Sequence, residues 1–118
     1  MSIKEILQKT AAEQRKALLN KEISAVELVK ETIEQVKTVD GELGAFNSLC
    51  EKQAIETAQN VDKKIANGEK IPALAGIPLA LKDNMNYKGS KTTASSKILE
   101  NFVSPYDATV VKKLKENF

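Results

Sequence analysis

The chain has 118 residues and a formal net charge of +2 at pH 7, and 42% of its residues are hydrophobic. These values fit one globular domain or part of one, and they argue against wholesale disorder and against a strongly basic nucleic-acid-binding surface. Histidine is absent, so triads and metal sites that need histidine are excluded within this chain.

The cysteine content and the hydropathy pattern indicate a reducing, aqueous environment. Cys50 is the only cysteine, so no disulfide can form within the chain. It ends the apolar run from Phe46 to Leu49 and is expected to be a small buried hydrophobe. No segment has the length of a membrane span, and the N-terminus lacks the layout of a signal peptide. We therefore expect a cytoplasmic protein with no membrane partner.

Two capping boxes predict helices in the first 40 residues. A serine followed three residues later by a glutamate occurs twice, as Ser2 with Glu5 and as Ser24 with Glu27. Apolar residues then recur at helical spacing after each serine. The pattern predicts helices over residues 3–20 and 24–38, with Asp40-Gly41 and Gly44 breaking the second pattern.

The remaining residues alternate between short apolar runs and helical patterns. A strand is predicted over residues 45–50, followed by a helix over 51–67 with Gly68 as its cap. A second strand is predicted over 77–82 and a last helix over 107–117, with Asp107 as its N-cap. This order indicates an α/β fold.

The stretch from Gly76 to Asn84 reads Gly-Ile-Pro-Leu-Ala-Leu-Lys-Asp-Asn. Strand periodicity places Lys82 on the same face as Pro78 and Ala80, at the C-terminal end where ligand sites of α/β sheets collect. A lysine acts as a base only when it is neutral; burial and nearby cations favour that form, and a close carboxylate such as Asp83 opposes it. From these residues alone, a solvated surface lysine is the commoner interpretation.

The same stretch resembles the catalytic-lysine strand of amidase-signature enzymes. The resemblance covers essentially the whole chain, starting with the helical block Glu22–Leu28. Further blocks look like the tRNA-dependent amidotransferase branch of the family, namely Thr92-Thr93, Ser96-Lys97, Leu99–Phe102 and Tyr106–Val111. The resemblance implies the N-terminal part of the amidase-signature fold, with helices flanking the first strands of a mixed sheet.

The family resemblance also implies an activity. In that branch the glutaminase subunit hydrolyses glutamine with a Ser–Ser–Lys triad and supplies ammonia to convert Glu-tRNA(Gln) to Gln-tRNA(Gln), or Asp-tRNA(Asn) to its amide, in translation. By matching position, Lys82 would be the lysine of the triad. The implied partners are the B and C subunits, glutamine and, through the complex, charged tRNA. ATP and magnesium would be used by the whole complex, and no cofactor or metal site is expected in this chain.

The sequence departs from the family at one point that matters for activity. The family's Gly/Ser-rich segment, which carries both serines of the triad, has no counterpart among these 118 residues. Ser95 and Ser96 lie in a different block and are expected to be a loop and a helix cap. We therefore expect an N-terminal fragment that is inactive alone. The alternatives are a fragment of another amidase-signature amide hydrolase and a non-catalytic interaction module.

Overall fold

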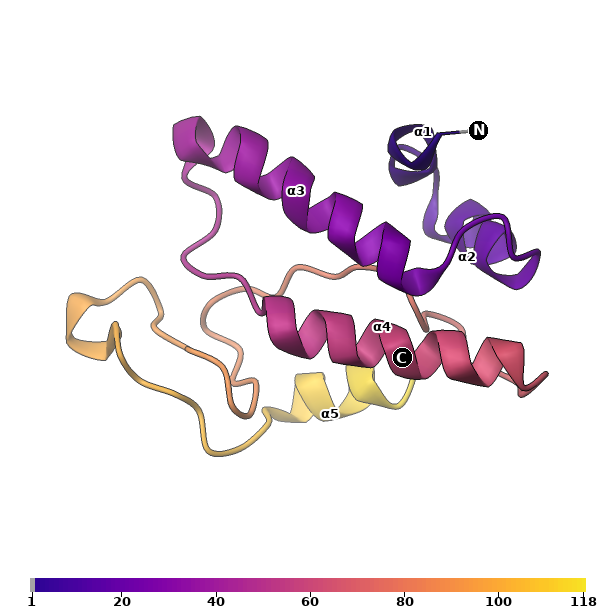
Figure 1. The fold of residues 1–118 in the computed structure, drawn as a ribbon. Helices are drawn as coiled ribbons and strands as arrows, with labels where there is room; N and C mark the ends of the chain where they lie inside the picture. The colour runs from indigo at the N-terminus through magenta and orange to yellow at the C-terminus, as the bar shows by residue number, and fades with distance from the viewer. Residues whose placement is uncertain (1) are drawn as a thin grey trace.

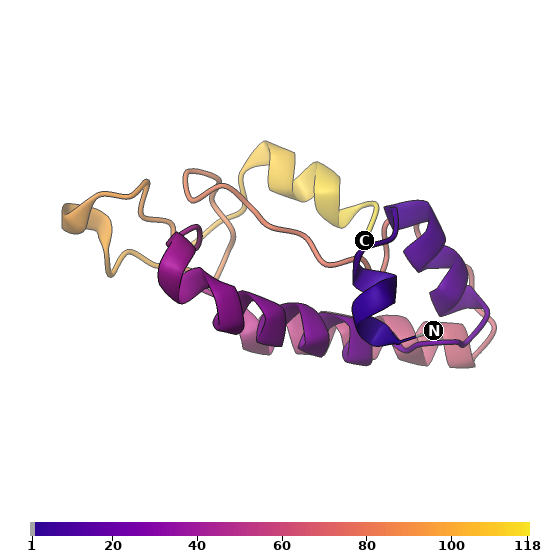
Figure 2. The ribbon, with the colours of Figure 1, turned by 90° about the horizontal axis from the view of Figure 1, so that it is seen from above.

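A computed structural model describes residues 2–118 as a set of helices joined by long loops (Figure 1). The helices are α1 (Ile3–Leu7), α2 (Ala11–Leu19), α3 (Ala25–Leu43), α4 (Glu51–Ala66), the 3-10 helix η1 (Lys97–Leu99) and α5 (Thr109–Lys115). Helices α3 and α4 pack side by side and run in opposite directions. Figure 2 shows α5 and the chain that follows α4 on one side of this pair. None of the described helices is both long and apolar enough to span a membrane.

The prediction of one helix over residues 3–20 is wrong, because the structure divides this segment into α1 and α2. Thr10 lies between them in an extended conformation and starts α2. Its hydroxyl accepts a hydrogen bond from the Glu13 N–H at 3.2 Å, and the Glu13 carboxylate accepts one from the Thr10 N–H at 2.9 Å. The hydrogen bond from the Thr10 N–H, and after it one from the Thr10 hydroxyl at 2.9 Å, hold the pKa of the Glu13 carboxyl below its ordinary value. A third capping box thus interrupts the predicted helix.

Helix α3 is longer than the predicted segment 24–38. It starts as expected with the Ser24 capping box, but it continues to Leu43 and ends at Gly44, whose φ of 62° lies in the left-handed region. The Asp40 carboxylate accepts hydrogen bonds from the N–H groups of Ala45 at 2.7 Å and Phe46 at 3.2 Å. Asp40 therefore closes the helix end instead of breaking the helix.

The two later helices lie inside the predicted ranges 51–67 and 107–117. Gly68 follows α4 with a φ of 70°. The prediction of Asp107 as an N-cap is wrong, because Ala108 occupies that position without a side-chain cap. The Asp107 carboxylate instead accepts hydrogen bonds from the Lys88 N–H at 2.8 Å and from the Lys115 ammonium at 2.6 Å. Asp107 thus ties the loop before α5 to the last turn of α5.

No strand is present among residues 2–118, so the predicted strands over 45–50 and 77–82 are corrected to loop segments. A strand needs the N–H and C=O groups of a neighbouring strand. The Asp40 carboxylate already takes the N–H groups of Ala45 and Phe46, and Pro78 has no N–H to donate. The only strand-like pairing in the described chain is an isolated bridge between Lys91 and Val103.

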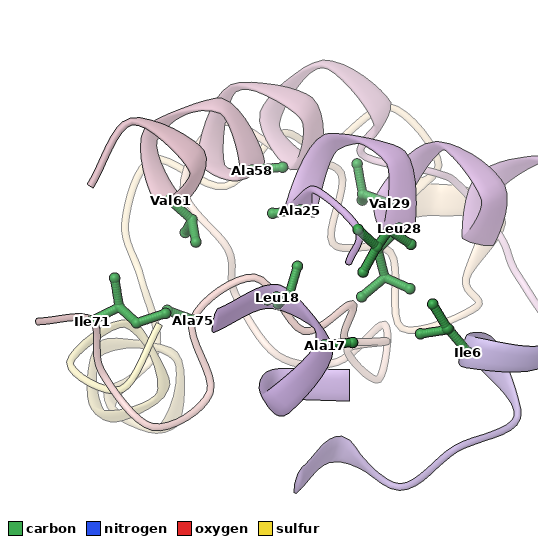
Figure 3. Packing of buried hydrophobic residues seen from close by; sticks show 11 residues of the cluster. Ile6, Ala17, Leu18, Ala25, Leu28, Val29, Ala58, Val61, Ile71 and Ala75 are labelled. Atoms are coloured by element: carbon green, nitrogen blue, oxygen red, sulfur yellow. The ribbon is translucent and has the colours of Figure 1, made fainter. Parts of the chain in front are cut away.

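The hydrophobic core lies between the helices and the loop that follows α4 (Figure 3). It contains eleven buried residues, with Leu18 and Leu28 almost fully enclosed: Ile6, Ala17, Leu18, Ile23, Ala25, Leu28, Val29, Ala58, Val61, Ile71 and Ala75. The Arg15 guanidinium fastens the loop by donating to the carbonyls of Pro72 at 2.6 Å and Ile71 at 3.2 Å. The core thus fixes the start of the segment that leads to Lys82.

Asp62 of α4 holds the start of α3 and gives a test of this packing. Its carboxylate accepts hydrogen bonds from the N–H groups of Ala25 at 2.7 Å and Val26 at 3.1 Å, which have no partners within their own helix. Asp62→Ala should lower the free energy of unfolding by about 1–3 kcal/mol, since two partly buried donors lose their acceptor. Urea denaturation checks this, with the exposed Glu56→Ala on the same helix as control. Equal stability of the two variants would contradict the assignment.

Candidate functional site

Lys82 lies at the end of the loop segment 77–82, where the chain enters a turn. Its carbonyl accepts a hydrogen bond from the Met85 N–H at 3.0 Å. Its side chain is exposed, and the ion pairs found within residues 2–118 do not include it. Ala80, which the strand pattern places on the same face, is exposed, and Leu79 on the other face is 54% exposed. Within the described residues, the face that carries Lys82 is therefore open.

The next residue, Asp83, is held on several sides. Its carboxylate accepts hydrogen bonds from the Thr93 N–H at 2.9 Å, from the Thr93 hydroxyl at short range, and from the Asn47 amide at 2.7 Å. Its backbone carbonyl accepts one from the Ala94 N–H at 2.8 Å. These donors, first the Thr93 hydroxyl, hold the pKa of Asp83 below its ordinary value. Asp83 thus joins three segments that are far apart in the sequence.

The loop bound by Asp83 has an unusual backbone. Ala94 and Ser95 have φ values of 48° and 57°, in the left-handed region that residues with side chains seldom adopt. The Thr93 hydroxyl accepts a hydrogen bond from the Ser95 N–H at 3.2 Å, and the Asn47 amide donates to the Ser95 hydroxyl at 3.0 Å. Such conformations persist only where the surroundings hold them, and here the Asp83 hydrogen bonds do so.

A polar cleft of ≈ 360 Å³ opens beside this loop. Asn47, Thr93 and Ser95 line it together with two lysines and Glu100. Ser95 and Ser96 are in the loop, as the sequence predicts, although the Ser96 side chain makes no capping hydrogen bond at the start of η1. Lys82 is not among the lining residues. Asp83 therefore connects Lys82 to the wall of the cleft.

Cys50 belongs to a second polar cluster, which the sequence did not predict. Its thiol donates to the Ser90 hydroxyl at 3.3 Å, and that hydroxyl donates to the Gln53 side-chain carbonyl at 2.5 Å. The Gln53 amide in turn donates to the Lys88 carbonyl at 3.2 Å. This cluster joins the start of α4 to the loop after Lys82. No group of three or more metal-ligating side chains occurs in residues 2–118.

Comparison with protein families matches residues 27–117 to the family described as Amidase. The chain therefore belongs to the amidase family, and the resemblance inferred from its motifs is confirmed.

The curated relatives of the chain include amidotransferase subunits. It is 53% identical over 108 residues to the A subunit of the Heliobacterium modesticaldum glutamyl-tRNA(Gln) amidotransferase, and 50% identical over 111 residues to the A 2 subunit from Clostridium acetobutylicum. These alignments cover 92% and 94% of this chain but 22% and 23% of the relatives, respectively. The chain thus spans less than a quarter of the length of these relatives.

A solved structure has a similar fold. It is described with the words "An unexpected vestigial protein complex reveals the evolutionary origins of an s-triazine catabolic enzyme", and it matches this chain with a TM-score of 0.81 and 29% identity. The match covers 99% of this chain and 24% of the solved chain. The helices and long loops described above therefore recur within a larger protein.

Proposed function

We propose that this chain provides the N-terminal part of the glutaminase subunit of a tRNA-dependent amidotransferase, and that Lys82 is its catalytic base. The observation that carries the proposal is the high identity, 45–53% over 92–94% of the chain, to relatives named as A or A 2 subunits of glutamyl-tRNA(Gln) amidotransferases. The resemblance of the block from Gly76 to Asn84 to the family's catalytic-lysine strand supports the assignment of Lys82.

The proposed chemistry is hydrolysis of glutamine to glutamate and ammonia. A serine hydroxyl attacks the side-chain amide carbon, and its proton passes through a second serine to the neutral amine of Lys82. Cleavage of the C–N bond returns this proton to the departing ammonia and leaves an ester. Water then hydrolyses the ester and releases glutamate, which is the Ser–Lys form of nucleophilic catalysis. Both serines and the donors to the oxyanion lie outside residues 1–118 in this proposal.

The proposal also includes the remainder of the fold and the complex. In the complete domain, further elements of a mixed sheet cover the exposed Leu79 and bury Lys82. The B and C subunits receive the ammonia and amidate Glu-tRNA(Gln) or Asp-tRNA(Asn) with ATP and magnesium. The complex acts in the cytoplasm.

A second candidate is another amide hydrolase of the same family. The solved structure whose description names an s-triazine catabolic enzyme has the same fold at 29% identity, and this similarity favours the second candidate. The identity to the amidotransferase subunits is higher, at 50–53% for two of them. A non-catalytic interaction module is the third possibility. Turnover of glutamine, as opposed to other amides, by a complete enzyme separates these functions.

A chimaera tests the proposed function directly. Residues 1–118 replace the matching N-terminal segment of the Heliobacterium modesticaldum relative, which is 53% identical, and the product is purified with the B and C subunits. We expect glutamine-dependent amidation of Glu-tRNA(Gln) or Asp-tRNA(Asn) at a rate close to that of the parent complex. A complex that assembles but neither hydrolyses glutamine nor amidates tRNA would contradict the proposal.

The 118-residue chain alone should release no ammonia from glutamine. A base without a nucleophile and without donors to the oxyanion has no group to activate and no charge to stabilise. Coupled detection of ammonia with the purified chain checks this, and the Lys82→Ala chain is the matched control. Turnover above that control would show that the chain carries its own nucleophile.

A further inference from the structure

The strongest feature that the proposed function leaves unused is the set of hydrogen bonds around Asp83. Its carboxylate and its carbonyl receive four hydrogen bonds from Asn47, Thr93 and Ala94. We infer that Asp83 is a positioning residue for Lys82, and that it acts through Thr93 and Asn47. This inference rests on the proposed role of Lys82 as the base.

The backbone carries the effect from Asp83 to Lys82. A trans peptide is planar and keeps neighbouring Cα atoms about 3.8 Å apart. The hydrogen bond from the Ala94 N–H to the Asp83 carbonyl, and that from the Met85 N–H to the Lys82 carbonyl, hold both sides of the turn. The Cα atom of Lys82 therefore has a fixed place, and only its side-chain torsions remain to be set. A base must reach its proton within hydrogen-bond distance, so this restriction matters for catalysis.

The same hydrogen bonds direct the Asp83 carboxylate. Three donors occupy it, two from Thr93 and one from Asn47, and a carboxylate has about four acceptor sites in all. The carboxylate is thus turned toward the loop at Thr93, and the ion pairs of residues 2–118 do not join it to Lys82. A bond from Asp83 to the Lys82 ammonium would favour the charged form, which cannot act as a base.

The strained loop shows that these residues act as a unit. Ala94 and Ser95 keep their positive φ values while their N–H groups bond to Asp83 and Thr93. Asn47 donates to both the Asp83 carboxylate and the Ser95 hydroxyl. Removal of the Asp83 carboxylate or the Thr93 hydroxyl removes the hydrogen bonds that hold the loop. The turn that carries Lys82 then becomes free to move relative to the cleft.

The test uses the chimaeric complex described above. Thr93→Val keeps the shape of the side chain and removes the hydroxyl that bonds to Asp83, whereas Thr93→Ser keeps the hydroxyl. We expect Thr93→Val and Asp83→Ala to lower glutaminase kcat by about 10²-fold, with little change in KM for glutamine, because misplacement by about 1 Å has effects of this size. Thr93→Ser should keep most of the activity. Asp62→Ala is the control, since its carboxylate also accepts backbone N–H groups but lies in the helical core.

The possible results separate this inference from the proposed function. If Lys82→Ala abolishes hydrolysis while Thr93→Val and Asp83→Ala keep their kcat, Asp83 does not position Lys82. The same holds if both variants lose activity only in proportion to their folded fraction, as Asp62→Ala should, or if Thr93→Ser fails as badly as Thr93→Val. If Lys82→Ala itself retains activity, the proposed function fails instead. Circular dichroism and thermal unfolding of each complex supply the folded fraction.

Discussion

Gly76→Ala is expected to destabilise the fold by about 2–5 kcal/mol, a large part of the roughly 5–15 kcal/mol that holds a typical domain together. Gly76 has a φ of 80°, so a side chain there is strained in any surroundings. A Cβ atom would also lie 2.9 Å from the Leu18 Cδ1 atom and 3.3 Å from side-chain atoms of Ala25 and Val61. Since Leu18 and Ala25 are fully buried, the neighbours have little room to move.

Two other glycines separate the two causes of the lost stability, which are backbone strain and steric overlap of the new Cβ atom. Gly68 has a φ of 70° with nothing within 4 Å of the added Cβ, so Gly68→Ala should show the backbone strain alone, about 1–2 kcal/mol. Gly41 lies inside α3 in open space, and Gly41→Ala should stabilise by about 0.5–1 kcal/mol. Urea denaturation of the three variants checks this order of their free energies of unfolding. If Gly76→Ala were no less stable than Gly68→Ala, the close packing of Gly76 against α2, α3 and α4 would be wrong.

The helical part of the fold could be predicted from local patterns, because each helix carries its own signals. The capping boxes at Ser2 and Ser24 are present as predicted. The box at Thr10 does not stand out in the sequence, because the apolar spacing continues across it and suggests one uninterrupted helix. The local pattern ends α3 too early, since Asp40 and Gly41 are typical helix breakers and only the structure shows Asp40 bonding to the next loop.

The loop segments could not be predicted in the same way. A strand is defined by its neighbour, and apolar alternation at residues 77–82 indicates where a strand can form but not which segment pairs with it. The hydrogen bonds of the candidate site are equally hard to predict from the sequence. The sequence shows Asp83 only as a carboxylate next to Lys82, whereas its bonds to Asn47 and Thr93 join residues 36 and 10 positions apart, respectively. No periodic pattern marks Asn47, so only the folded chain brings it to this site.

Substitution of Lys82 should have the largest effect on activity. In the chimaeric complex, Lys82→Ala removes the group that accepts the serine proton, and loss of a general base costs about 10²–10⁴-fold in rate. The loss should exceed this range, because the same amine also protonates the leaving ammonia. Lys82→Arg should fail nearly as badly, since arginine stays protonated and cannot serve as a base. The fold of residues 2–118 should remain intact, because within these residues the Lys82 side chain is exposed and makes no ion pair.

The most direct test of this account is the glutaminase kcat of the Lys82→Ala, Lys82→Arg and Lys88→Ala chimaeras, measured side by side. Lys88 is the matched control, an exposed lysine in the loop after Lys82. We predict that Lys82→Ala loses more than about 10⁴-fold in kcat, that Lys82→Arg loses nearly as much, and that Lys88→Ala keeps nearly all of it. If Lys82→Arg kept most of the activity, or if Lys88→Ala lost as much as Lys82→Ala, Lys82 would not be the catalytic base.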